Sequence, residues 1–126
     1  MSSNNGWKGK AITAITVVVA LLFVAAGGAK LVQAEAELKV FAHFEIPVYL
    51  MLMAGMAEVA AAVLLVVPRT TSLGGVIGVA VMSNAIAAHL HVGEYPQAIV
   101  PLVVAGLCIT AGWARRANLA NWLSQS

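Results

Sequence analysis

The sequence contains few residues of the kinds that most redox and metal sites require. Its single cysteine, Cys108, lies in an apolar segment. A Cys-x-x-Cys redox pair, an intramolecular disulfide and a cysteine zinc site are therefore excluded. Charged residues make up only 10% of the chain and the formal net charge is +2. The longest basic run is the pair Arg115-Arg116, so nucleic acid is not an expected partner.

Hydrophobic residues, by contrast, make up 61% of the chain, and its mean hydropathy is +0.92. A soluble domain carries about 25% charged residues. This chain has too little polar surface to cover a globule in water. We therefore predict an integral membrane protein, with residues 1–126 forming a single transmembrane domain.

The apolar residues are grouped in four segments, each close to the ~20 residues that cross a bilayer. Backbone groups in lipid must form hydrogen bonds within their own segment, so the segments are helices. The sequence predicts an all-α integral membrane four-helix bundle. Its spans are expected at about residues 11–29, 46–68, 71–90 and 97–114.

Charge is divided between the two ends of this arrangement. The basic residues of one end are Lys8, Lys10, Arg69, Arg115 and Arg116; the acidic residues of the other are Glu35, Glu37, Glu45 and Glu94. The positive-inside rule predicts an inner-membrane protein with both termini in the cytoplasm. An alternative for the first span is a cleavable signal peptide, which its basic start and small residues resemble.

Three further segments carry structural signals. Residues 32–45 combine spaced apolar residues with charges, which predicts a short amphipathic segment at the outer interface after the first span. The tail, residues 116–126, is expected to lie in the same way on the inner surface. Gly74 and Gly78 form a Gly-x-x-x-Gly pair in the third span, for which packing within the bundle is favoured over dimerisation.

Glu58 is the only charged residue between Ile46 and Pro68. A charge at mid-depth costs at least ~2.5–3.5 kcal/mol, so it requires an internal partner. At 1.5 Å per residue, Lys30, Asn84 and the two histidines near the end of the third span come to the outer half of the bundle. Glu58 forms the floor of the polar pocket that they predict.

Candidate roles follow from chemistry and helical phase. Glu58 and His89 are the candidate catalytic residues, while Lys30, Asn84 and His91 are the candidate substrate-binding residues. His89 and His91 are two residues apart and point in different directions on a helix, so no metal site is predicted. Purely structural readings remain for each residue, such as an ion pair for Glu58 and contact with headgroups for Lys30.

Several motifs recur in a known family: GGAKL at 27–31, GMAEVAAAVLLVVPR at 55–69 and MSNAIAAHLHVGEYPQ at 82–97. In this order and spacing the chain resembles the DoxX and DoxX-like family. The resemblance implies a four-helix membrane bundle linked to membrane redox work, such as subunits of thiosulfate:quinone oxidoreductases. It also implies that Lys30, Glu58 and His89 occupy the family's recurring polar positions.

Three functions are consistent with these features. The first is a redox-associated or quinone-linked membrane subunit, with a quinone as its ligand and an oxidoreductase as its partner protein. The second is a stand-alone membrane enzyme, of an isomerase or epoxide-opening type, that acts on a lipophilic small molecule through the acid–base chemistry of Glu58. The third is a non-catalytic assembly or small-molecule-binding factor, and the residues alone do not decide whether the chain is an enzyme.

Overall fold

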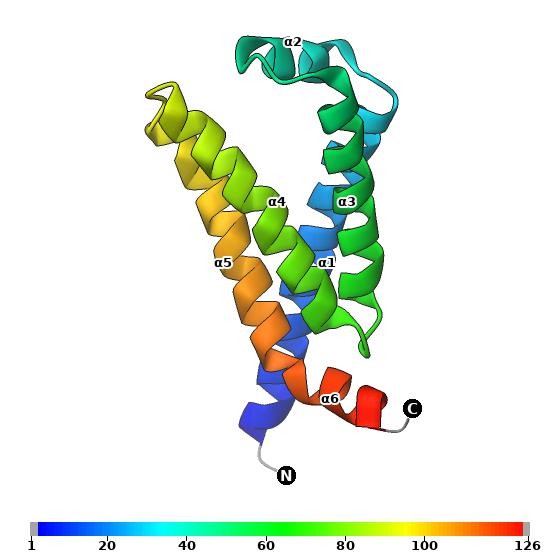
Figure 1. Ribbon diagram of the computed structural model, residues 1–126. Helices are drawn as coiled ribbons and strands as arrows, with labels where there is room; N and C mark the ends of the chain where they lie inside the picture. The colour runs from blue at the N-terminus through cyan, green and yellow to red at the C-terminus, as the bar shows by residue number, and fades with distance from the viewer. Residues whose placement is uncertain (1–2, 125–126) are drawn as a thin grey trace.

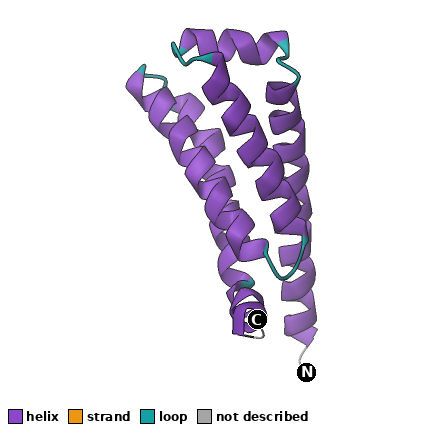
Figure 2. Ribbon diagram, turned by 45° about the vertical axis from the view of Figure 1, so that its right-hand side comes forward, coloured by secondary structure: helices purple, strands orange, loops and turns teal. Residues whose placement is uncertain are grey.

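The computed structural model describes residues 3–124, and the side chains of residues 6–124. These residues form helices and connecting turns and contain no strand (Figures 1 and 2). The elements are α1 (Ser3–Leu31), α2 (Glu35–His43), α3 (Val48–Val66), α4 (Thr71–His91), η1 (Pro96–Ala98), α5 (Ile99–Ala114) and α6 (Arg116–Ser124). The all-α prediction is confirmed.

Four of these helices are long and apolar enough to cross a membrane, namely α1, α3, α4 and α5 with η1. They coincide with the four predicted spans, and the prediction of a four-helix membrane bundle is confirmed. The largest difference is the start of α1, which begins at Ser3 and not near Ala11. Hydropathy marks the part of a helix that lies in lipid, and a helix can continue beyond it.

The bundle consists of two helix pairs, with α1 packed on α3 and α4 packed on α5. The pairs meet mainly through α3 and α4, near the end where both chain termini lie (Figure 1). From there they diverge toward the opposite end, across which α2 lies (Figures 1 and 2). We call these the basic end, after its five Lys and Arg residues, and the α2 end.

The core lies where the two pairs meet. It contains Val19, Ala20, Phe23, Ala61, Ala62, Leu65 and Cys108, all nearly or fully buried. Glycines let α4 approach this core closely. A methyl group added at Gly74 would lie 2.7 Å from the backbone nitrogen of Leu65, and one at Gly78 would lie 2.7 Å from Sγ of Cys108. The Gly-x-x-x-Gly pair thus serves packing within the bundle, as predicted.

The turn between α3 and α4 is held by proline and threonine. Val67, which precedes Pro68, has an extended backbone and ends α3, because a residue before proline disfavours the helical region. The Thr70 hydroxyl donates to the Leu64 carbonyl and the Thr71 hydroxyl to the Leu65 carbonyl, each at 2.9 Å. These bonds satisfy carbonyl groups that the end of α3 leaves free.

The two short helices lie at opposite ends of the bundle (Figure 1). α2 falls within the predicted amphipathic segment, and Leu38, Phe41 and Phe44 on its apolar side are half-buried. α6 begins at Arg116, as predicted for the tail, and its Asn118 amide donates to the Pro68 carbonyl at 3.2 Å. The last two residues of that predicted segment lie outside the described residues.

Gly74→Ala should destabilise the bundle by about 1–3 kcal/mol, because the added methyl group would overlap the backbone of α3. The matched control is Gly106→Ala on α5, where an added methyl group has no atom within 4 Å. That variant should be neutral or slightly stabilising, because alanine favours a helix over glycine. Thermal unfolding in detergent, followed by circular dichroism, measures both. Equal melting temperatures for the two variants would contradict the close packing of α4 on α3.

Candidate functional site

Lys30 and Glu58 form an ion pair inside the bundle. Lys30 Nζ lies 2.8 Å from Glu58 Oε1, and the two side chains are only 13% and 2% exposed. Helix direction explains the contact. Side chains tilt toward the N-terminus of their helix, and α1 and α3 are antiparallel neighbours (Figure 1). Lys30 at the end of α1 therefore reaches into the bundle, while Glu58 in α3 points back toward it.

Two glycines bring the backbones of these helices together beside the pair. A methyl group added at Gly27 would lie 2.8 Å from the Gly55 carbonyl oxygen and 3.1 Å from Cβ of Glu58. One added at Gly55 would lie 2.9 Å from Cβ of Lys30. Any larger residue at either position would separate α1 from α3. Gly27 and Gly55 are thus positioning residues for the ion pair.

The ion pair is shielded from its surroundings. Glu58 Oε1, the oxygen that faces Lys30 Nζ, is fully buried. The ammonium group balances the charge of the carboxylate. Lys30 is the more exposed of the two side chains, so it is the member of the pair that an approaching molecule can contact first.

α2 supplies two further contacts to Lys30. Glu37 Oε2 lies 3.7 Å from Lys30 Nζ, and Nζ also lies 6.0 Å from the centre of the Phe41 ring. The sequence placed Glu37 among the acidic residues of this end, but it gave no sign that Glu37 lies beside Lys30. The signal was weak, because the turn between α1 and α2 decides which charges of α2 face the bundle.

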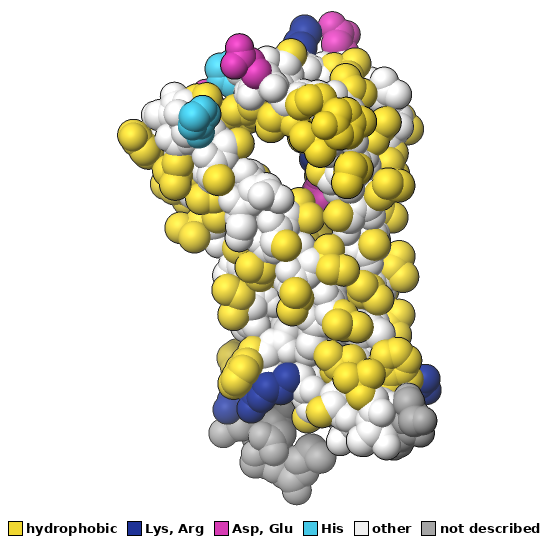
Figure 3. Space-filling view, viewed as in Figure 1, with side chains coloured by type: hydrophobic (Ala, Val, Ile, Leu, Met, Phe, Trp, Pro, Cys, Tyr) yellow, Lys and Arg dark blue, Asp and Glu magenta, His cyan; other side chains and the backbone are white. Residues whose placement is uncertain are grey.

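An opening lies below α2, between the diverging helix pairs. Figure 3 shows it passing between the two sides of the molecule, with acidic and basic atoms at its inner margin and hydrophobic side chains around it. α1 and α3, which carry Lys30 and Glu58, form one side of it (Figure 1). In a bilayer such an opening faces lipid, so a lipophilic molecule could reach the ion pair without crossing water.

At the α2 end of the opening, residues at the end of α2 contact residues at the end of α4. His89 Nδ1 and His43 Nε2 each lie 3.4 Å from a different carboxylate oxygen of Glu94. The Phe44 ring packs edge-on against both imidazoles, with centroids 5.1 Å apart in each case. We call these four residues the latch. They hold the end of α2 against α4 and close the opening on the side away from α1.

The structure does not bring every predicted site residue to the ion pair. His89 belongs to the latch, whereas Asn84 and His91 are exposed side chains of α4. Neither side chain forms a hydrogen bond or an ion pair with Lys30 or Glu58, so the convergence of all five candidate residues on one pocket stays a prediction for Asn84 and His91. The pair of α4 and α5 diverges from the pair of α1 and α3 toward the α2 end (Figure 1), so depth along a span does not by itself bring a side chain of α4 to Glu58. His89 is half-buried and His91 is exposed.

The arrangement offers a cation, a carboxylate and an apolar approach. Lys30 can donate a hydrogen bond and Glu58 can accept one or exchange a proton. Within residues 6–124, no group of three His, Cys, Asp or Glu side chains has an arrangement that could hold a metal ion. The site is therefore suited to the polar headgroup of an otherwise apolar molecule.

Comparison with known proteins yields one match. The family model described as the DoxX-like family matches residues 14–111, which include α3, α4 and most of α1 and α5. No curated protein and no solved structure matches the chain.

Replacing one partner of the ion pair should cost about 3–5 kcal/mol, because it leaves the other charge buried and uncompensated. The Lys30→Met and Glu58→Met variants should each show this loss. The double variant should recover most of it, since it buries neither charge. A double-mutant cycle on unfolding in detergent measures the coupling.

The control for this cycle is the exposed pair of Lys39 and Glu35 on α2, in which Lys39 Nζ lies 3.3 Å from Glu35 Oε1. Its coupling should be about 0.5 kcal/mol or less. If the coupling between Lys30 and Glu58 were equally small, the buried ion pair would be disproved.

Glu94→Gln should weaken the latch, because it removes the carboxylate that both histidines contact. Amide hydrogens of α2 should then exchange several-fold faster, since local opening of a weakly held helix needs little free energy. Hydrogen–deuterium exchange with mass spectrometry measures this rate. Glu45→Gln, next to the latch but with no ion pair among the described residues, is the control and should leave the rate unchanged.

Proposed function

The chain belongs to the DoxX-like family, and we propose that it is a redox-associated membrane subunit that binds a quinone. The quinone headgroup lies at Lys30 and Glu58, and its apolar tail extends through the opening into the lipid. The observation that carries this proposal is the ion pair, buried within apolar helices yet beside an opening toward the bilayer.

Stability alone gives little reason for this pair. Removing two charges from a polar environment is costly, and well-packed apolar residues of similar volume are often as stabilising or more so. An ionisable pair inside a membrane protein instead marks a functional site in many cases. Lys30, the more exposed member of the pair, gives the site a hydrogen-bond donor that a ligand can contact.

The residues match the chemistry of a quinone headgroup. Its carbonyl oxygens are hydrogen-bond acceptors, and Lys30 carries a donor within the site. Reduction of a quinone to a quinol consumes two electrons and two protons. In the ion pair it is the Lys30 ammonium that has a proton to give, while the Glu58 carboxylate can take up a proton in the reverse reaction; the remaining proton comes from water or the partner. The electrons come from a partner oxidoreductase, because Cys108 alone cannot form a redox pair.

The orientation follows from the charges. The basic end faces the cytoplasm under the positive-inside rule, so both termini are cytoplasmic and the protein lies in the inner membrane. The ion pair then lies in the outer half of the bilayer. Exposed Trp7 and Trp113 near the basic end and exposed Tyr49 and Tyr95 near the α2 end support a membrane position between these levels.

Decylubiquinone should bind the detergent-solubilised protein at one molecule per chain, as measured by native mass spectrometry. Lys30→Met and Glu58→Gln should each weaken binding about tenfold, which corresponds to ~1.4 kcal/mol for one lost charge-assisted hydrogen bond. Circular dichroism at the same temperature establishes that each variant is folded.

The matched control is Glu35→Gln, which removes an acidic charge from exposed α2 without touching the ion pair. It should bind decylubiquinone like the unmodified protein. Equal weakening by Glu35→Gln, or no binding by the unmodified protein, would refute the proposed site.

A further inference from the structure

The basic end has an excess of positive charge that the chain itself does not balance. All five acidic residues of the sequence are glutamates in α3, in α2 and its adjoining turn, or in the turn after α4, and none lies at the basic end. The basic residues there are Lys8, Lys10, Arg69, Arg115 and Arg116. No ion pair involves any of them among the described side chains. Their positive charges are therefore available to an anionic partner.

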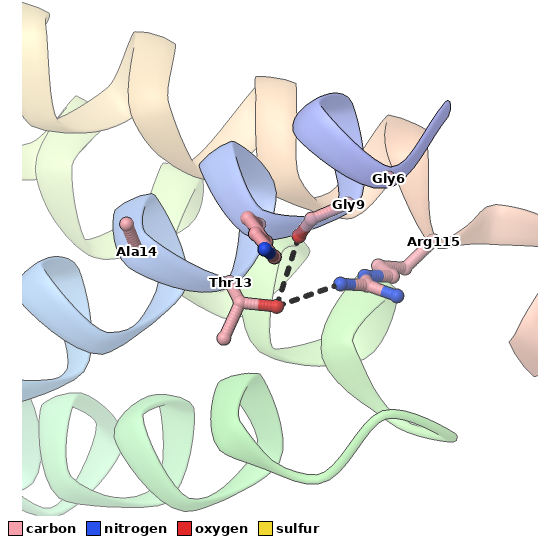
Figure 4. A pocket seen from close by; sticks show the side chains of 6 residues that line it. Gly6, Gly9, Thr13, Ala14 and Arg115 are labelled. Atoms are coloured by element: carbon pink, nitrogen blue, oxygen red, sulfur yellow. Dashed lines mark hydrogen bonds between the residues drawn. The ribbon is translucent and has the colours of Figure 1, made fainter. Parts of the chain in front are cut away.

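A depression of about 530 Å³ lies beside two of these residues (Figure 4). Its lining consists of Gly6, Gly9, Lys10, Thr13, Ala14 and Arg115. Arg115 Nη2 donates to Thr13 Oγ1 at 3.1 Å, and the Thr13 hydroxyl donates to the Gly9 carbonyl at 3.0 Å. The guanidinium group is thereby held at the edge of the depression, while its other N–H groups remain available.

The glycines keep the depression open. A methyl group added at Gly6 or Gly9 would meet no atom within 4 Å. Helix packing therefore does not require glycine at either position, in contrast to Gly74. Both lie on the same side of α1 as Thr13, at spacings of three and four residues. Their missing side chains leave space in front of Arg115.

A smaller groove adjoins this depression. It shares Thr13 and Arg115 with the depression, and the rest of its lining comes from α1, the end of α3 and the start of α4, namely Thr16, Val17, Leu65, Val66, Pro68 and Thr71. Its volume of about 90 Å³ suits part of a chain and not a headgroup. A depression with basic side chains that adjoins a narrow, mainly apolar groove matches a molecule with an anionic head and a hydrocarbon tail.

We infer that the basic end carries a binding site for an anionic phospholipid. The phosphate lies between the Lys10 ammonium and the Arg115 guanidinium groups, and one acyl chain follows the groove between α1 and α3. Basic pockets at this level of a membrane protein commonly bind anionic headgroups. Arginine supplies paired donors that match phosphate oxygens, and lysine supplies a point charge.

The test is native mass spectrometry of the full-length protein in neutral detergent with added dioleoylphosphatidylglycerol. Lys10→Gln and Arg115→Gln should each lower its affinity roughly tenfold. Lys10→Gln is the more decisive variant, because the structure gives Lys10 no contact whose loss would disturb folding. Arg69→Gln is the matched control, since it removes one charge from the same end outside the depression.

A second pair of variants tests whether the lipid needs the empty volume of the depression, independently of the charges of Lys10 and Arg115. Gly9→Leu should fill the depression and lower the affinity at least several-fold without disturbing the packing. Gly106→Leu is its control on the outside of α5, where an added side chain also meets open space. It should bind dioleoylphosphatidylglycerol like the unmodified protein.

Each remaining outcome would overturn the inference. Equal loss from Lys10→Gln and Arg69→Gln would mean general electrostatic attraction to anionic lipid. Equal affinity for dioleoylphosphatidylcholine would mean that the anionic charge is not recognised. Displacement of dioleoylphosphatidylglycerol by millimolar inorganic phosphate would mean a site for free phosphate.

Discussion

The ion pair between Lys30 and Glu58 is the contact on which the outer half of this bundle depends. A carboxylate surrounded by apolar helices requires a countercharge within reach. That countercharge comes from the last turn of α1, and it reaches Glu58 because Gly27 and Gly55 let the two backbones touch. The close packing of the two glycines and the position of the buried ion pair therefore depend on each other.

The divergence of the two helix pairs gives this feature its access to lipid. Near the basic end, Gly74 and Gly78 let α4 pack tightly on α3 and the core. Toward the α2 end the pairs separate, and the latch joins them again only at the top. An opening therefore remains between a tightly packed half and a capped end.

Much of the fold was predictable from the sequence, because lipid restricts what a chain can do. Apolar segments of bilayer length must be helices, and the four spans lie where composition indicates them. Pro68 and Gly93 also mark real helix ends, the latter with a positive φ of 79°. The start of α1 was not predictable from hydropathy, since the helix extends beyond its apolar part. Glu58 stood out as a site residue because a lone charge in a span is rare.

The sequence by itself thus determined that the chain is a four-helix membrane bundle with Glu58 as its most unusual residue. Only the tertiary structure decided which polar residues meet Glu58. Depth along each span predicts Asn84 and His91 in the outer half, but depth does not specify how far neighbouring helices diverge. Glu37 joined Lys30, and His89 joined Glu94, because turns between helices set the direction of α2 and of the end of α4. These directions depend on contacts between segments distant in sequence, which periodicity and hydropathy do not contain.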